Sequence, residues 1–176
     1  MRTPATLRPG TRAWLLLDID GVLSPFVSRS QAKKLGLRTF KLSVEDVGSY
    51  YAGHRFDMMT WVADAVAQLD LLTPAWCTSW WLEADTMIGN RVGLGPWPTV
   101  QLGYYEHDPA ASKVTGITEL VGSDPFVWID DDPGQDVDEL LAALPNDHLF
   151  LRTRPDVGLT PEHLERASAW AAALPV

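Results

Sequence analysis

The sequence predicts a doubly wound α/β fold with a mainly parallel sheet, and three features support this. Short, uniformly apolar runs end in acidic residues at 13–17 and 126–129, which is typical of strands buried on both faces. Segments with the apolar spacing of helices alternate with these runs, and Gly or Pro marks several of their ends. Strands that alternate with helices pair in parallel through right-handed crossovers, so we expect helices on both sides of one sheet.

The first half of the chain contains two expected strands. The first covers residues 13–17 and ends in Asp-Ile-Asp-Gly. Apolar residues from Phe56 to Leu69 approximate a helical stripe, and residues 73–77 have the composition of a second strand. Between the first strand and this helix, residues 24–55 are irregular, with weak alternation at 37–44 that favours a β-hairpin. We interpret this segment as a small flap.

The second half continues the alternation. A helix is expected at residues 81–92, with its end marked by Gly93 and Gly95, and a short helix is expected around Lys113. The next strand, 126–129, ends at Asp130-Asp131-Asp132-Pro133-Gly134. A helix at 137–144, a strand at 148–151 and a last helix from Pro161 to about Ala173 follow, the last one capped by Thr160.

Length and composition predict a single domain over residues 1–176. With 46% hydrophobic residues, the chain can form one sizeable core and is too short for two ordinary domains. Neither 24–55 nor 80–112 is long enough for a large cap domain. We therefore expect an open site.

Charge and cysteine content exclude several classes of protein. The net charge of −9 argues against extended nucleic-acid binding, which requires clustered Lys and Arg. The lone cysteine, Cys77, excludes an internal disulfide and a cysteine-based zinc site, and its apolar position favours a core role. With one cysteine the chain needs no oxidising compartment, so we expect a cytoplasmic location, and no apolar run reaches the roughly 20 residues of a membrane span.

Polar side chains follow several of the expected strands. Ligands bind outside the carboxyl ends of the strands in open parallel sheets, so residues at these positions are candidates for a common site. The candidate catalytic or metal-binding residues are Asp18, Asp20, Thr78, Lys113, Asp130 and Asp131.

These residues resemble the motifs of the haloacid dehalogenase (HAD) superfamily. Residues 15–23, Leu-Leu-Leu-Asp-Ile-Asp-Gly-Val-Leu, resemble its first motif, and Thr78, Lys113 and the Asp130-Asp131 pair match the next three in order over about 13–132. Residues 77–80, 128–132 and 152–160 are also similar to the small HAD domains associated with RNA-repair proteins. The resemblance implies a HAD-type Rossmann-like fold with a small flap.

The resemblance also implies a magnesium-dependent phosphohydrolase. Asp18 would attack phosphorus to form an aspartyl phosphate, and Asp20 would act as the acid and then the base. Lys113 would pair with Asp18, and Thr78 would bind a phosphoryl oxygen. Magnesium would be held by Asp18, the backbone carbonyl of Asp20 and the Asp130-Asp131 pair, because this ion prefers oxygen ligands.

Several assignments stay open. Either acid of the Asp130-Asp131 pair could be the direct metal ligand, with the second favoured by the family pattern. Ser79 competes with Thr78 for the phosphate contact, and Trp80 or Trp81 could stack on a base. By contrast, Trp14, Trp76 and Trp128 lie in expected strands and are predicted to be core residues.

Substrate and turnover are open as well. An open site admits a nucleotide, a polynucleotide end or a phosphoprotein as the phosphomonoester. Two alternatives to an enzyme use the same groups: a phosphate-accepting signalling module similar to receiver domains, and a catalytically silent binding protein on the same fold. The chain order of the acidic motifs argues against the receiver-like module, because receivers carry their paired acids on the first strand.

Overall fold

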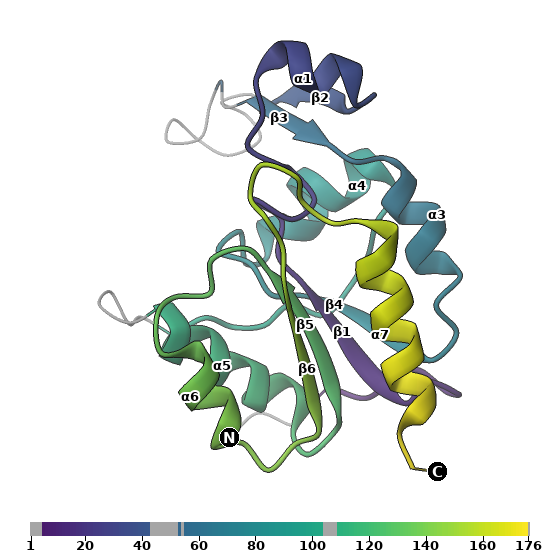
Figure 1. Ribbon diagram of the computed structural model, residues 1–176, viewed down its shortest axis with the longest axis vertical. Helices are drawn as coiled ribbons and strands as arrows, with labels where there is room; N and C mark the ends of the chain where they lie inside the picture. The colour runs from purple at the N-terminus through teal and green to yellow at the C-terminus, as the bar shows by residue number, and fades with distance from the viewer. Residues whose placement is uncertain (1–4, 43–52, 54, 104–108, 176) are drawn as a thin grey trace.

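A four-stranded parallel sheet lies at the centre of the computed structural model, which describes residues 5–42, 53, 55–103 and 109–175 (Figure 1). Its strands are β1 (Ala13–Leu17), β4 (Leu72–Trp76), β5 (Phe126–Asp130) and β6 (His148–Arg152), in the order β4-β1-β5-β6. The predicted α/β class with a parallel sheet is confirmed.

Strand β1 has a central position that decides where the site can form. Leu17 at its end pairs with Trp76 of β4 on one side and Ile129 of β5 on the other. Every residue of β1, β4 and β5 is buried, as expected for strands covered on both faces. Residues that follow these three strands therefore emerge side by side at one edge of the sheet.

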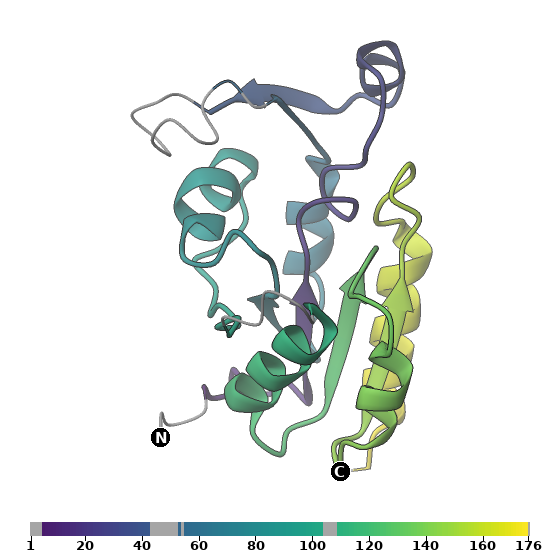
Figure 2. The same cartoon turned by 90° about the vertical axis from the view of Figure 1, so that its left-hand side faces the viewer.

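Helices cover both faces of this sheet (Figures 1 and 2). Leu15 and Leu17 of β1 belong to the core cluster that includes residues of α3 (Trp61–Ala67) and α7 (Pro161–Ala173). Trp14 and Leu16 point to the opposite core, with α5 (Pro109–Val121) and α6 (Val137–Ala142). Alternate β1 residues thus fill two cores, as the period of a strand requires. The tryptophans predicted to be core residues, Trp14, Trp76 and Trp128, are fully buried.

A small accessory unit lies beyond the carboxyl ends of the strands (Figure 1). It contains α1 (Arg29–Lys34) and an antiparallel hairpin of β2 (Arg38–Lys41) and β3 (Arg55–Met58). The sequence predicted a hairpin around 37–44, whereas only β2 lies there and its partner is β3. Helix α1 was not predicted. Residues 43–52 and 54 of the expected flap, and 104–108 of the segment 80–112, lie outside the described residues.

The helix predicted from Phe56 to Leu69 is wrong in its first part. Phe56 belongs to β3, where it pairs with Phe40 of β2, and the two rings stack with centroids 5.6 Å apart. The helix proper, α3, begins at Trp61. Apolar spacing alone could not separate the strand from the helix, because the partner of Phe56 is an aromatic residue from another part of the chain.

The helix predicted at 81–92 is also corrected. The segment forms a π-helix, η1 (Ala84–Gly89), followed by the single turn α4 (Asn90–Val92). The end at Gly93 is as predicted, and Gly93 has a φ of 79°. Gly89 lies so close to its neighbours that a Cβ atom there would be 2.7 Å from the carbonyl oxygen of Leu94. The side chain of Trp76 in β4 would be the next nearest neighbour, at 3.1 Å, so position 89 has no room for a side chain.

Other differences are smaller. β4 begins and ends one residue before the predicted strand, β5 and β6 each run one residue further, and α6 ends at Ala142. Helix α5 has thirteen residues and is not the short helix expected around Lys113. The last helix has the predicted bounds, and the backbone N–H of Thr160 donates to Nδ1 of His163 at 3.1 Å.

In the described part of the chain, no helix has the length and apolar character needed to cross a bilayer.

Candidate active site

The sheet places most of the predicted polar residues at one edge. Asp18 and Asp20 follow β1, and Asp130 and Asp131 lie at the end of β5. Lys113 enters from α5, on the face that packs against Trp14 and Leu16. The residues brought into direct contact or close proximity are Asp18, Lys113, Asp130 and Asp131.

Lys113 bridges two carboxylates. Its Nζ atom lies 2.7 Å from Oδ2 of Asp18 and 2.6 Å from Oδ2 of Asp130. The side chains are shielded, since only 8% of Lys113, 7% of Asp18 and none of Asp130 is exposed. Burial alone would lower the pKa of Lys113, but the charges of Asp18 and Asp130 raise it above its ordinary value. The lysine is therefore a permanent cation beside the Asp18 carboxylate.

Asp130 has the most complete set of partners in the site. Its Oδ2 atom also accepts a hydrogen bond from Nε1 of Trp128 at 3.1 Å, and its Oδ1 atom accepts one from the backbone N–H of Asp132 at 3.1 Å. Burial raises the pKa of Asp130 and the charge of Asp18 raises it further, while Lys113 opposes both effects. With both oxygens engaged, Asp130 is suited to hold Lys113 in place.

Asp131 packs against the turn that follows β1. Gly21 has a φ of 65°, and a Cβ atom at this position would lie 2.2 Å from Cγ of Asp131. The carbonyl of Gly21 accepts a hydrogen bond from Oγ1 of Thr153 at 3.1 Å. Glycine is thus required at position 21 both for its backbone conformation and for the close approach of the Asp131 side chain.

The acids fit a hard divalent cation. Carboxylate oxygens of Asp18, Asp130 and Asp131 lie within 4.8 Å of one another, and Asp20 adds a fourth acidic group nearby. Lys113 supplies a single compensating charge among these five residues. A cluster with this excess of carboxylate oxygens favours a cation such as Mg²⁺, which takes oxygen ligands and keeps several waters. The side chain of Asp20 is not part of the three-acid cluster.

Asp20 lies in a different environment from Asp18. Its Oδ2 atom accepts a hydrogen bond from Nε1 of Trp80 at 2.9 Å. Trp80 in turn meets the ring of Phe56 edge to face, with centroids 5.2 Å apart. Burial raises the pKa of Asp20, the hydrogen bond from Trp80 opposes this, and the charge of Asp18 adds to the rise. A carboxyl group with a raised pKa can donate a proton more readily near neutral pH.

The residues after β4 differ strongly in accessibility. Thr78 is fully buried, and its Oγ1 atom accepts a weak hydrogen bond from the backbone N–H of Trp80 at 3.4 Å, whereas Ser79 is exposed. The structure thus does not bring Thr78 into contact with the charged residues. Cys77 is buried and its pKa is raised by burial, in agreement with a core role. Trp81 is partly exposed, with a φ of 49° that is unusual outside glycine.

Sequence reasoning missed the residues that support the site. The sequence predicts Trp128 as a core residue and Trp80 as a candidate for base stacking. In the structure the indole N–H of Trp128 donates to Asp130, and that of Trp80 donates to Asp20. Phe56 was assigned to a helix. No local signal indicated these contacts, although the position of Trp128 two residues before Asp130 places both side chains on the same face of β5.

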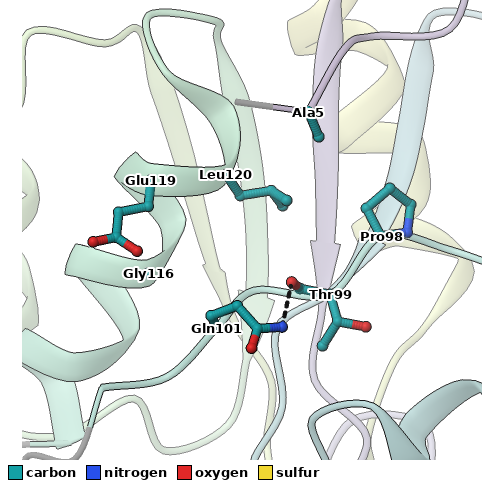
Figure 3. Close-up of a pocket in the computed structure, with 7 residues that line it drawn as sticks. All are labelled: Ala5, Pro98, Thr99, Gln101, Gly116, Glu119 and Leu120. Carbon is teal, nitrogen blue, oxygen red and sulfur yellow. Dashed lines mark hydrogen bonds between the residues drawn. The ribbon is translucent and has the colours of Figure 1, made fainter. Parts of the chain in front are cut away.

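A separate hollow of about 220 Å³ lies between α5 and the segment that follows α4 (Figure 3). Its lining includes Ala5, Pro98, Thr99, Gln101 and Glu119, and the Gln101 side chain donates to the Thr99 carbonyl. None of the residues predicted for the site lines it. The hollow is therefore distinct from the cluster of acidic residues at the strand ends.

Comparison with known proteins adds no assignment. A scan against protein-family models, a search of curated proteins and a search of solved structures each found no match to this chain.

Proposed function

We propose that this protein is a Mg²⁺-dependent phosphohydrolase that cleaves a phosphomonoester through an aspartyl phosphate on Asp18. One observation carries the proposal: a buried lysine holds the Asp18 carboxylate while two further acids lie close enough to share a cation. A carboxylate can attack a phosphate ester only when positive charge neutralises the phosphoryl oxygens. Lys113 supplies part of that charge, and the acid cluster is suited to supply the rest through a metal.

The first step is transfer of the phosphoryl group to the protein. An Asp18 oxygen forms a bond to phosphorus as the bond from phosphorus to the leaving oxygen breaks, and Asp20 gives its proton to that oxygen. The backbone N–H of Ile19 donates to Oδ1 of Asp18 at 2.6 Å, and Lys113 binds Oδ2. These two contacts orient the nucleophile.

The second step is hydrolysis. Asp20, now ionised, takes a proton from water as the water oxygen bonds to phosphorus and the bond to Asp18 breaks, which releases phosphate. Asp18, Asp131 and the backbone carbonyl of Asp20 would hold the ion, and Asp130 would support them through Lys113. When bound, Mg²⁺ would neutralise the phosphoryl oxygens. Of the two candidates Thr78 and Ser79, the exposed Ser79 would bind one of these oxygens, because Thr78 is fully buried.

The placement of Asp20 favours turnover over the two non-enzymatic alternatives. A phosphate-accepting signalling module requires a long-lived aspartyl phosphate, and a silent binding protein requires no acid. Here a second carboxyl group with a raised pKa stands beside the nucleophile and is oriented by Trp80. Such a group serves both steps of an enzyme. We propose a nucleotide or a polynucleotide end as the phosphorylated substrate.

The test is a phosphatase screen of nucleotides, sugar phosphates and 3′- or 5′-phosphorylated oligonucleotides, with and without Mg²⁺. We expect steady phosphate release that requires Mg²⁺ and disappears in EDTA. A stable phosphoprotein with negligible release, detected by intact mass, would instead favour the signalling module. No reaction with any phosphomonoester would favour the silent binding protein.

A further inference from the structure

We propose that the protein selects phosphomonoesters whose leaving alcohol carries one aromatic ring system and no further phosphate. This inference rests on the proposed function, because it concerns the group that departs from phosphorus. The shared chemistry is that of a nucleoside or an arylalkyl alcohol. It is carried by a pocket that opens on the Asp20 side of the site.

The pocket is in the right place for the leaving group. It has a volume of about 560 Å³ and is lined by Asp20, by residues 24–27 of the turn after β1, and by residues of β3. Asp20 must reach the leaving oxygen to protonate it, so the rest of the leaving group has to extend on the Asp20 side. Lys113 and Asp130 are not part of the lining. The volume lies within the range of about 300–1,000 Å³ typical of small-molecule sites.

The walls favour a flat ring. Phe26 lies in the lining with 62% of its surface exposed, so an apolar face is open to a ligand. Phe56 and Trp80 form the neighbouring wall, and their edge-to-face contact and the bond from Trp80 to Asp20 hold both rings in fixed orientations. Preorganised aromatic side chains gain contact area with a ring at a low cost in conformational entropy.

The charges of the walls disfavour a second phosphate. Among the described lining residues the cation is Arg55, and it forms an ion pair with Asp57, whose Oδ1 atom also accepts from Thr39. A leaving group with further phosphates would thus meet no positive charge among these residues that is not already paired with a carboxylate. A single nucleoside fits these walls better than a polynucleotide chain.

The experiment compares substrates with the same kind of leaving oxygen. Ethyl phosphate and 2-phenylethyl phosphate are both esters of primary alcohols and differ by the ring. We expect the ring to raise kcat/KM by about ten- to a hundredfold, the range for one aromatic stacking contact. Phe26→Ala should remove most of this ratio. Leu82→Ala is the control, because Leu82 is 70% exposed and lies outside the pocket, and it should preserve the ratio.

A second comparison separates the two sources of an aromatic alcohol. Adenosine 5′-monophosphate is compared with 2-phenylethyl phosphate and with a 5′-phosphorylated oligonucleotide. The faster of the first two identifies the source, and the oligonucleotide should be slower than the mononucleotide. Two results would overturn the inference and leave the proposed phosphatase activity standing. One is an oligonucleotide that is processed faster than both small substrates. The other is a wild-type kcat/KM for 2-phenylethyl phosphate that equals the value for ethyl phosphate.

A binding measurement keeps the two proposals distinguishable. If no phosphomonoester is hydrolysed, the proposed function fails, and the pocket is tested alone by titrating adenosine and 2-phenylethanol into Asp18→Asn protein. Tryptophan fluorescence reports binding, because Trp80 lines the pocket. We expect saturable binding of at least one alcohol that Phe26→Ala weakens about tenfold or more and Leu82→Ala preserves. Absence of saturable binding overturns the inference independently of catalysis.

Discussion

Two acids that leave the same strand, Asp18 and Asp20, lie in two contrasting environments. Asp18 lies beside Lys113, from α5, and Asp130, the last residue of the neighbouring strand β5. Asp20 faces Trp80 and a pocket whose wall includes the accessory hairpin. In the first environment Asp18 is ion-paired with Lys113, and in the second burial raises the pKa of Asp20. The contrast supports the proposed roles of Asp18 as nucleophile and Asp20 as acid.

The largest expected effect comes from the nucleophile. Asp18→Asn should lower turnover by roughly a thousandfold or more, because an amide is a poor nucleophile and the metal site loses a charge. Steady-state phosphate release measures this, with circular dichroism to verify folding. Phosphate release at the wild-type rate from a folded, pure variant would overturn the proposed role of Asp18 as the nucleophile.

The ion pairs of Lys113 with Asp18 and Asp130 should also contribute strongly to the free energy of unfolding. Lys113→Met would leave the buried carboxylates of Asp18 and Asp130 unpaired, at a cost of about 3–5 kcal/mol in the free energy of unfolding. Urea denaturation measures the loss. Arg154→Ala is the control, because the Arg154–Asp156 ion pair is exposed and its removal should leave the midpoint unchanged. Equal midpoints for both variants would show that the buried bridge contributes nothing.

The same variant should respond to pH in a defined direction. Burial and the charge of Asp18 raise the pKa of Asp130 in the folded protein, and the loss of Lys113 removes the opposing effect. The pKa of Asp130 in the folded variant then lies above the value of about 7 that it has beside Lys113, so the stability deficit of Lys113→Met shrinks as the pH falls toward about 7 and is constant below it. A deficit that grows on acidification would contradict this assignment of charge.

The metal requirement should separate adjacent acids. Asp131→Ala should raise the Mg²⁺ concentration for half-maximal activity by at least about tenfold, since even indirect supports of a metal contribute about 10–100-fold to affinity. Asp132→Ala is the matched control, because its exposed side chain lies outside the three-acid cluster. Magnesium titration of EDTA-treated protein measures both variants. Equal effects would overturn the choice of Asp131 as the ligand.

The smallest effect tests the Asp20 side. Trp80→Phe keeps a ring against Phe56 but removes the N–H that orients Asp20, so we expect about a tenfold loss in kcat for ethyl phosphate. The loss should be smaller for 4-nitrophenyl phosphate, whose leaving group needs little protonation. Trp170→Phe, the same substitution in α7, is the control. A uniform loss across both substrates would mean that Trp80 acts through general packing.

Local patterns predicted much of the fold but little of the aromatic framework. Each strand of the parallel sheet was located to within about one residue, because an apolar run between turn residues is a local signal. Phe56 was misassigned because its contacts are with Phe40 and Trp80, distant in sequence. The π-helix before α4 was expected as an ordinary helix, because apolar spacing does not separate the two kinds of winding.

For the site, residue type and order along the chain determined the candidate acids and Lys113, since the carboxyl ends of adjacent parallel strands must meet. Only the tertiary structure decided which partners each of these residues has and how far each is exposed. Both oxygens of Asp130 accept hydrogen bonds, from Trp128, Lys113 and the backbone. Asp131 packs against Gly21. Thr78 is buried, whereas Ser79 is exposed. The physical reason is that a carboxylate's role depends on its burial and its partners, and those partners come from elements far apart in the sequence.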